Sequence, residues 1–460
     1  MNKKNILKIS KSLIKLKQQS PSDKKFNFSF DSKYLHYQSY LRDFSLDQYK
    51  LFDELYNELE VDHSIDGLFS GDTVNTTEGR PALHHKYRSA SPDPEFDFKK
   101  ITQSLLAEIK KGGYENIITF GIGGSYEGPK LLQELCFKAS SAHKYFFVCG
   151  PDKDEFNAIV KPLLGQKNFY IFSSKSLATD EILTCLRWLG SHRTPHNAAV
   201  ITSNFQAAKK LDFSESSIVL FPESVGGRYS IWSPISLSAS IESNFSSFLK
   251  GGNAADVLLV NDSADSKRYK KLLKTLAFSD IWFNNYRNKA NRIVLSYNWG
   301  LRSLADYVQQ LEMESLGKPA NKHSILKKTG QSIFGGFGST AQHSYFQLLH
   351  QGTADFCADI IFSPMATSPL SSAQAKGQAY LLATKQKKSL NSLELNNGNA
   401  PVNFFTLKHL TLPALGFLLA TWEHRVFIAA AMLQINPFDQ FGVAAGKKAA
   451  NRFIKKNHQY

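Results

Sequence analysis

Short apolar runs alternate with amphipathic segments between residues 98 and 220. The runs have the length of buried strands and lie at 116–120, 145–149, 168–172, 198–202 and 217–220. The segments 98–111, 129–138 and 179–189 carry apolar residues at helical spacing. Strands that are apolar throughout and separated by helices form a parallel sheet that is covered on both faces. An α/β fold is therefore predicted for this region.

A second series of the same kind is predicted after residue 250. Strands are expected at 256–260, 292–296 and 359–362, with more helix toward the C-terminus. The segment Lys250-Gly-Gly-Asn253 has the composition of a turn, so the joint between the two series is placed there. The chain is accordingly divided into a helical extension over 1–95, expected to pack on the C-terminal domain, and two α/β domains over 96–252 and 253–460.

Two segments resemble export or membrane signals on first inspection. Residues 1–25 are rich in lysine and have apolar residues at helical spacing, but no continuous apolar segment follows. A basic surface helix is predicted there, not a secretory signal. The segment 410–435 is the most apolar of the chain, yet Pro413 and the charged residues 423–425 interrupt it. A buried core helix is predicted there, and no membrane partner is expected.

The composition indicates the charge of possible partners but does not identify them. Lys and Arg number 55 and Asp and Glu 40 among 460 residues, which gives a formal charge of +15. This excess favours anionic partners, either nucleic acid or small phosphorylated ligands, although a lysine-rich surface without a specific role is the simpler explanation. No nucleic-acid-binding motif accompanies it, so no nucleic acid partner is expected. The four cysteines form no Cys-x-x-Cys pair, which argues against a zinc ribbon and is typical of thiols in a reducing cytosol.

Two strand-to-helix junctions carry candidate ligand-binding chemistry. The loop Gly121-Ile-Gly-Gly-Ser125 would let backbone N–H groups approach an anion. A dinucleotide fingerprint needs glycine where Tyr126 stands, so a nicotinamide dehydrogenase is disfavoured, and a sugar or phosphate loop and an ordinary tight turn stay equally open. The segment 173–179 combines hydroxyls with Lys175, which suits a phosphate monoester. A helix cap with spare serines is the alternative, but two such junctions together favour a phosphate site.

An arginine and a glutamate are candidates for the reacting centre. Arg228 follows two glycines and could stabilise a developing oxyanion, although an isolated arginine more often forms a surface ion pair. Gln310 and Glu314 are four residues apart and share a helix face, where the carboxylate could act as a base. A solvated acidic patch that includes Glu312 is the alternative for this segment.

Two later segments carry further basic groups. His343 lies near a Gly/Ser/Thr loop, where a structural role is the usual alternative to a catalytic one. No histidine pair at a spacing of four residues is present, so zinc is not expected. Lys447 follows a turn that contains Gln440, and the alternative is a lysine that only covers a helix surface.

Taken in order from about residue 67 to 447, these segments resemble the phosphoglucose isomerase family. They are NTTEGRPALH (75–84), GIGGS, SKSLAT, VGGRYSIWS, QQLEMESLGK, QHSYFQLLHQGT and FDQFGVAAGK. The resemblance implies two sugar-isomerase (SIS) domains, each a mainly parallel sheet between helices, in a homodimer without cofactor or metal. It also implies reversible isomerisation of glucose 6-phosphate to fructose 6-phosphate in the cytoplasm, in glycolysis and gluconeogenesis.

The resemblance implies roles for individual residues. The substrate contacts would be Gly124, Ser125, Ser174, Lys175, Ser176, Thr179, Gln310 and Gln440. Glu314 would move the proton between C2 and C1 through a cis-enediolate, which Arg228 would stabilise. Lys447, and His343 from the neighbouring subunit, would move protons during ring opening.

The chain departs from the family pattern at three places. The loop before His343 has Ser339-Thr340-Ala341 where the family usually has Thr-Asn-Gly, Ala400 replaces an arginine, and Ala444 replaces a glutamate. None of these changes removes a proton-transfer residue, so an active isomerase is expected. The alternative is a non-catalytic regulator that binds sugar phosphates, which could dispense with Glu314, Arg228 and Lys447.

Overall fold

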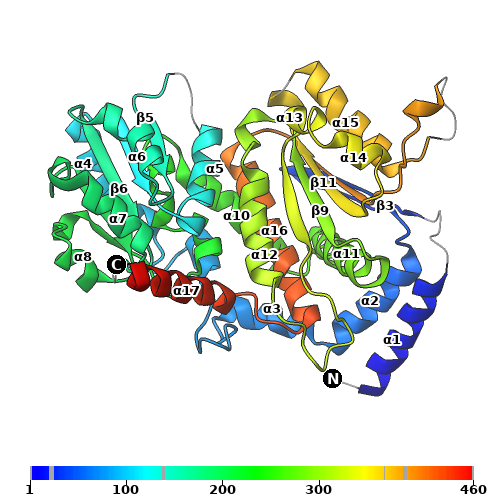
Figure 1. The fold of residues 1–460 in the computed structure, drawn as a ribbon. Coiled ribbons are helices and arrows are strands. Elements are labelled where there is room, and N and C mark those ends of the chain that lie inside the picture. The colour runs from blue at the N-terminus through cyan, green and yellow to red at the C-terminus, as the bar shows by residue number, and fades with distance from the viewer. Residues whose placement is uncertain (1–2, 20–24, 137–139, 367, 387–390, 458–460) are drawn as a thin grey trace.

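Two sheets organise the computed structural model, which describes residues 3–19, 25–136, 140–366, 368–386 and 391–457 (Figure 1). In this part of the chain the first sheet has five parallel strands in the order β5-β4-β6-β7-β8. The strands are β4 (Asn116–Phe120), β5 (Lys144–Val148), β6 (Asn168–Ser173), β7 (Ala198–Thr202) and β8 (Ile218–Leu220). The accompanying helices are α4 (Phe98–Gly112), α5 (Glu127–Cys136), α6 (Lys153–Ile159), α7 (Asp180–Leu189) and α8 (Phe205–Lys210).

The second sheet has the order β1-β3-β12-β11-β9-β10, with β2 paired to β3. Its strands are β1 (Lys25–Phe26), β2 (Ser29–Asp31), β3 (Leu35–Arg42), β9 (Asn291–Ser296), β10 (Ser332–Phe337), β11 (Phe356–Phe362) and β12 (Val402–Leu407). Strands β9 to β12 are parallel, and β1, β2 and β3 are antiparallel to their partners. The remaining helices are α1 (Lys3–Gln18), α2 (Leu46–Glu58), α3 (Val61–Ser70), α9 (Leu237–Ser240), α10 (Phe245–Val260), α11 (Ala264–Arg287), α12 (Leu304–Leu316), α13 (Gly338–Gln342), α14 (Phe346–Gln351), α15 (Pro369–Ala383), α16 (Leu412–Leu433) and α17 (Phe441–Asn457).

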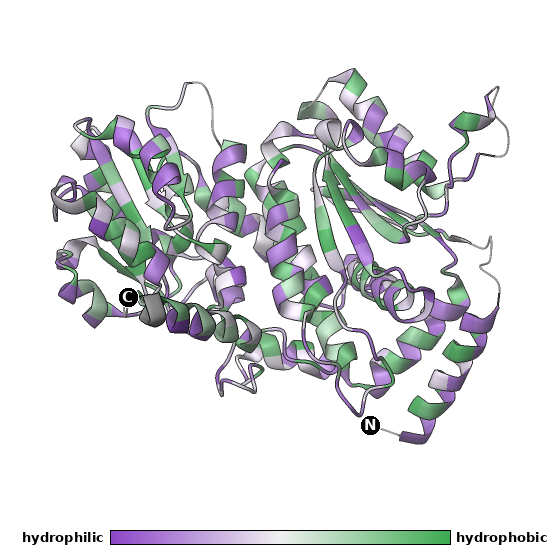
Figure 2. Cartoon of the chain, in the orientation of Figure 1, coloured by the Kyte–Doolittle hydropathy of each residue, from purple (hydrophilic) through white to green (hydrophobic). Residues whose placement is uncertain are grey.

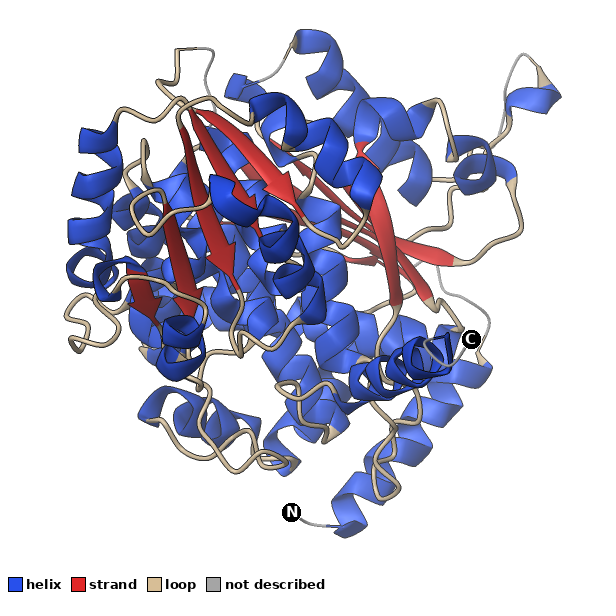
Figure 3. Cartoon of the chain, turned by 60° about the vertical axis from the view of Figure 1, so that its left-hand side comes forward, coloured by secondary structure: helices blue, strands red, loops and turns tan. Residues whose placement is uncertain are grey.

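The predicted α/β fold, with parallel sheets flanked by helices, is confirmed. Every residue of β4, β6, β7 and β11 is buried, because helices cover both faces of each sheet (Figure 3). Figure 2 shows the apolar residues concentrated in these strands. The strands predicted in the first series agree with the structure to within one residue at each end. The helix predicted over 129–138 appears as α5, and its last two predicted residues lie outside the described residues.

The turn predicted at 250–253 and the strand predicted at 256–260 are both wrong, because this whole segment belongs to α10. Its buried residues recur at helical spacing, and the apolar run at 256–260 is the last turn of the helix. The glycines mark a helix crossing: a Cβ on Gly251 would lie 2.0 Å from the Pro413 carbonyl oxygen of α16. The predicted domain boundary at residue 252 therefore falls inside a continuous helix. The three-part division of the chain stays a prediction.

The N-terminal segment was predicted to be a mostly helical extension, but it also supplies strands β1 to β3. Strand β3 pairs with β12 along its length, with Tyr40 opposite Val402 and Leu35 opposite Leu407. The residues of β3 alternate between buried and more exposed, the period of a strand. The predicted basic surface helix is present as α1, which buries Ile6, Ile9 and Leu13 and keeps its lysines outside.

Helix α16 is buried, as predicted. Among the described residues it is the one helix long and apolar enough to span a bilayer, and 94% of its most apolar window lies inside the structure. It also carries Glu423, His424 and Arg425 in its centre, and all three are buried. Buried charges of this kind require ionic partners, so the elements around α16 have to supply them.

The first set of partners joins α16 to α10 and to the 3₁₀ helix η1 (His84–Arg88). Arg88 donates two hydrogen bonds to Asp256, at 2.8 and 2.9 Å, and also pairs with Glu423. The Trp232 indole N–H donates to the other Glu423 oxygen at 2.7 Å. Burial raises the pKa of Glu423 to about 7 despite these contacts.

The second set joins α16 to α11, α12 and the second sheet. Arg425 donates two hydrogen bonds of 2.7 Å to Asp280 and one of 2.9 Å to Asp359. Arg292 of β9 pairs with Asp280 at 2.6 Å and with Glu312 of α12. Side chains on α11, α12, β9 and β11 are thereby held to one helix.

The crossing of α10 and α16 gives a test of the packing. We expect Gly251→Ala to lower the free energy of unfolding by about 1–3 kcal/mol, because the new methyl group has no room beside the Pro413 carbonyl. Equilibrium urea denaturation measures the change. The matched control is Gly377→Ala in α15, where nothing lies within 4 Å and the gain in helix propensity should raise stability by about 0.5–1 kcal/mol. Stabilisation of similar size by both substitutions would contradict the packing argument.

Candidate active site

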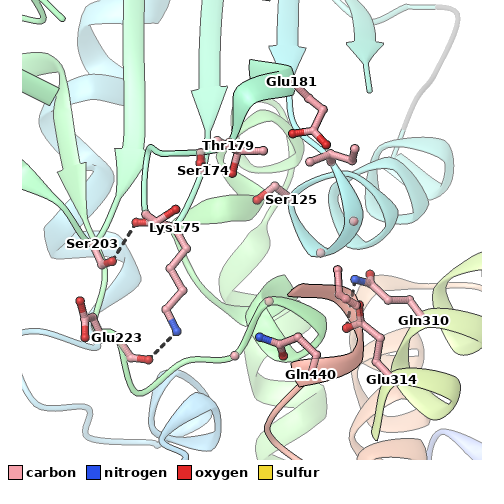
Figure 4. Close-up of a pocket in the computed structure, with 18 of the residues that line it drawn as sticks. Ser125, Ser174, Lys175, Thr179, Glu181, Ser203, Glu223, Gln310, Glu314 and Gln440 are labelled. Carbon is pink, nitrogen blue, oxygen red and sulfur yellow. Dashed lines mark hydrogen bonds between the residues drawn. The ribbon is translucent and has the colours of Figure 1, made fainter. Parts of the chain in front are cut away.

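A cavity of about 630 Å³ opens between the two α/β units, and residues from both line it. Most of the residues predicted from the sequence line it: Gly124, Ser125, Ser174, Lys175, Ser176, Thr179, Gln310, Glu314, Gln440 and Lys447. In Figure 4, Ser125, Ser174 and Thr179 lie on one side, and Gln310, Glu314 and Gln440 lie on the other. The first group comes from the segments that follow β4 and β6, and the second comes from α12 and the segment that leads into α17.

The hydroxyl-rich loop after β6 is held rigidly by the neighbouring strand. The Lys175 carbonyl accepts from Thr202 Oγ1 at 2.9 Å, and from the Ser203 N–H and Oγ at 2.9 and 2.8 Å. Leu177 has φ +50°, a left-handed conformation that its buried side chain holds in place. Ser174 Oγ donates to Thr179 Oγ1 at 3.1 Å, and the Thr179 side chain makes no cap bond to α7. The helix-cap alternative therefore does not account for these hydroxyls.

Lys175 reaches along the cavity toward the chain after β8 (Figure 4). Its ammonium group donates to the carbonyls of Glu223 at 2.6 Å and Val225 at 3.0 Å. Burial lowers the pKa of Lys175 to about 8, and the charges of Arg80 and Arg228 lower it further. A bound anion would favour the charged form and raise this pKa again.

The two glycine motifs pack directly against each other. A Cβ on Gly124 would lie 1.9 Å from the carbonyl oxygen of Gly227, so neither loop could approach the other with a larger residue at position 124. Gly123 has φ +57°, and a Cβ there would meet Gln310 Nε2 at 3.0 Å. The loop 121–125 is thus a tight turn whose glycines also bring its backbone against Arg228 and α12.

Arg228 is buried beside Glu314 and Gln440, which line the cavity, so the surface ion pair considered for it is wrong. It belongs to the 3₁₀ helix η6 (Gly227–Trp232). Its Nε is 3.3 Å from Glu314 Oε2. Its Nη2 donates to the Asp439 carbonyl at 2.6 Å, and its Nη1 donates to Gln440 Oε1 at 3.2 Å. The guanidinium thus touches both the carboxylate and the segment before α17.

Gln310 and Glu314 share one face of α12, as predicted, and Gln310 Nε2 is 3.5 Å from Glu314 Oε2. About 30% of the Glu314 side chain is exposed, toward the cavity. Glu312 points the other way, buried against Arg292 and the Trp422 indole. The solvated acidic patch is therefore wrong for this segment.

His343 is the predicted site residue that the single chain does not bring to the cavity. It is exposed at the end of α13 and is not among the residues that line the cavity. Two departures from the family pattern lie apart from the reacting groups: Ala400 is buried in the core of the second unit, and Ala444 is exposed on α17.

The sequence profile of the phosphoglucose isomerase family matches residues 43–460. The chain belongs to the phosphoglucose isomerase family. A glucose-6-phosphate isomerase of Shewanella sp. (strain MR-4) is 32% identical over 88% of this chain and 84% of its own length. The corresponding enzyme of Shewanella frigidimarina is 30% identical over 88% and 85%.

Solved structures show the same fold. A glucose-6-phosphate isomerase from Chlamydia trachomatis superposes with a TM-score of 0.83 at 22% identity, covering 99% of this chain and 96% of that one. A hypothetical protein from Thermus thermophilus superposes with a TM-score of 0.69 at 20% identity, covering 89% and 98%. The family profile and the relatives confirm the sequence resemblance to the phosphoglucose isomerase family.

Several residues that line the cavity were missed by the sequence analysis. Ser203 and Asn204 follow β7 directly, at the sheet edge where the 173–179 loop also lies. Since the carboxyl ends of adjacent parallel strands meet at one edge, the position of these two residues directly after a predicted strand could have indicated that they line the site. Arg80 and Glu223 come from distant loops, and their 3.7 Å ion pair could not be inferred from spacing. Among the described residues, no group of three His, Cys, Asp or Glu side chains could hold a metal ion.

Lys175 provides a test of the anion site. Sulfate binding at pH 8 should take up a fraction of a proton, because the dianion raises a pKa that starts near 8. Titration calorimetry in two buffers of different ionisation enthalpy measures this uptake. Lys175→Met should abolish the uptake and weaken sulfate binding by about tenfold or more, since it removes a charged donor.

Lys210→Met is the control, since Lys210 is exposed on α8 in the same unit. This variant should bind sulfate as the unaltered protein does. Unchanged affinity and proton uptake in Lys175→Met would place the anion elsewhere.

Proposed function

We propose that this protein interconverts glucose 6-phosphate and fructose 6-phosphate. One observation carries the proposal: the Glu314 carboxylate and the hydroxyl-rich loop with Lys175 line the same cavity from opposite sides (Figure 4). A sugar whose phosphate is held by that loop would extend its other end toward Glu314. Membership of the phosphoglucose isomerase family and the names of the relatives support this reaction.

The phosphate is bound at the end of the first sheet. Ser174, Ser176 and Thr179 supply hydroxyl donors, Lys175 supplies charge, and Ser125 lies beside them. This binding energy is remote from the reacting carbons, so it orients the sugar chain. Gly124, Gln310 and Gln440 are placed to contact the sugar between the two ends.

Glu314 moves the proton between the carbons. It removes the proton from C2 of the open-chain aldose, and the C–H electron pair forms the C1–C2 double bond while O1 takes the negative charge. The same carboxyl group returns the proton to C1, the hydroxyl proton on O2 passes to O1, and O2 becomes the ketose carbonyl. A cis-enediolate intermediate keeps both carbons on one face, within reach of a single carboxylate.

Arg228 stabilises the enediolate. It is buried and held by the Asp439 carbonyl and Gln440, so its charge is positioned before substrate arrives. Its contact with Glu314 also places the base and the oxyanion partner within one ion-pair distance, 3.3 Å. An arginine stays charged throughout, so it stabilises the intermediate without transferring a proton.

Ring opening requires two proton-transfer groups, of which one comes from each subunit. Lys447 of α17 lines the cavity and serves as one of them. The other is His343 of the partner subunit in a homodimer, which agrees with the exposed position of this residue at the end of α13. We place the reaction in the cytoplasm, where the free thiols of Cys149, Cys185 and Cys357 stay reduced.

A non-catalytic sugar-phosphate regulator is disfavoured by the same site. Binding alone would need the hydroxyl loop, but not a buried arginine aimed at a carboxylate on the opposite wall. The retention of Glu314, Arg228 and Lys447 around one cavity favours catalysis.

Glu314→Gln tests the base. We expect kcat for fructose 6-phosphate to fall by about 10²–10⁴, because an amide cannot accept the C1 proton of the ketose. A coupled assay measures turnover, and incorporation of solvent deuterium at C1 of the unconverted ketose measures proton abstraction separately. Glu215→Gln, at an exposed glutamate, is the control and should leave both unchanged. Turnover in Glu314→Gln equal to that of the unaltered protein would remove this residue from the mechanism.

Mixed dimers test the origin of the histidine. His343→Ala and Glu314→Gln chains, each nearly inactive alone, should regain about a quarter of full activity when co-expressed, because half of the dimers are mixed and each then has one intact site. If His343 acted within its own chain, every site would carry one defect and no activity would return. Glu314→Gln co-expressed with unaltered chain serves as the reference for mixing.

A further inference from the structure

Lys318 follows the helix that carries Glu314, and the proposed reaction gives it no role. Its ammonium group donates to the carbonyl oxygen of Glu314 and, at 2.8 Å, to the carbonyl oxygen of Asp439. It also lies 3.6 Å from Asp439 Oδ1, and only 12% of its side chain is exposed. The Glu314 carbonyl belongs to the last turn of α12, where carbonyls lack partners within the helix, so Lys318 caps the turn that holds the base.

The same ammonium group connects three separate parts of the site. Asp439 directly precedes Gln440 and the helix that carries Lys447. The other oxygen of Asp439 accepts a hydrogen bond of 2.7 Å from Thr77 Oγ1, in the turn that leads to Arg80. Through one acidic residue, Lys318 therefore reaches both the C-terminal wall of the cavity and the 75–80 turn.

Lys318 shares its two carbonyl acceptors with Arg228. Arg228 Nη2 donates to the Asp439 carbonyl at 2.6 Å and lies 3.5 Å from the Glu314 carbonyl. Two cations thus clamp the end of α12 to the segment 436–440. Each cation meets the same pair of oxygens, so a shift of either one changes the separation between the base and Gln440.

We propose that Lys318 is a positioning residue for the isomerisation, which fixes the Glu314 carboxylate relative to Gln440 and Lys447 by binding the Glu314 and Asp439 carbonyls together. The inference rests on the proposed function. It predicts an effect on turnover much larger than that on substrate affinity, because the phosphate is held on the opposite side of the cavity, where Lys318 makes no contact.

The charge of Lys318 is sensitive to pH. Burial lowers its pKa to about 8, the Arg228 charge lowers it further, and Asp439 and Glu314 oppose the change. As pH rises through this value the ammonium loses its proton, and its bonds to the two carbonyls weaken. In the substrate complex the phosphate dianion keeps Lys175 charged, so a fall in kcat above pH 8 reports Lys318 and not Lys175.

Three variants test the inference: Lys318→Met, Lys318→Arg and the control Lys322→Met, an exposed lysine in the same segment. Lys318→Met should lower kcat for fructose 6-phosphate by about 10–100-fold with KM changed by less than about threefold, since a small displacement of the base mainly affects the chemical step. Lys318→Arg should keep most of the turnover and lose the fall in kcat above pH 8, because arginine stays charged. Lys322→Met should match the unaltered protein.

Two results would overturn the inference. One is a kcat within about twofold of the unaltered protein in folded Lys318→Met, which shows that any loss comes from stability alone. The other is a pH profile in which kcat of Lys318→Arg falls above pH 8 as it does in the unaltered protein. This result would overturn the inference even if Lys318→Met does not fold. Turnover by the unaltered protein tests the proposed function separately.

Discussion

Pairing of the buried charges on α16 is the interaction on which the rest of the structure depends. Removal of one partner from a buried ion pair costs about 3–5 kcal/mol, so each of these contacts fixes its element strongly. The consequence reaches the active site through α12. Glu312 is drawn inward by Arg292 and Trp422, and this sets the rotation of the helix. Glu314 lies two residues further on, which turns it to the opposite face and toward the cavity.

The cavity itself combines cations from both units. Arg80, Lys175 and Lys447 line it, and Arg228 and Lys318 lie beside it on the carbonyls of Glu314 and Asp439. Backbone carbonyls satisfy several of these groups, so their positive charge is only partly neutralised by acids. Such a site attracts a phosphorylated ligand and orients it, in keeping with the proposed isomerisation. Part of the formal charge of +15 is therefore concentrated at this cavity, which the composition alone did not reveal.

The sequence predicted much of this arrangement, and its failures have physical causes. Apolar strands such as 116–120 are short and bounded by turns, so their period is unambiguous. The run at 256–260 has the same composition, yet it is helical because Asp256 and its apolar neighbours face α16 and Arg88 at helical spacing. Gly251 is a helix contact and not a turn, and only the position of Pro413 shows this. Arg80, Glu223 and Lys318 reach the site through tertiary contacts that no spacing along the chain encodes.

The walls of the cavity come from chain segments that span residues 80 to 447. The phosphate loop and its sheet are synthesised early, but Gln440 and Lys447 leave the ribosome close to the end of translation. A nascent chain can therefore complete its first sheet without assembling a working pocket. Premature termination between β8 and α17 yields a product that can form the first sheet but lacks the final wall, so catalytic competence is confined to finished molecules.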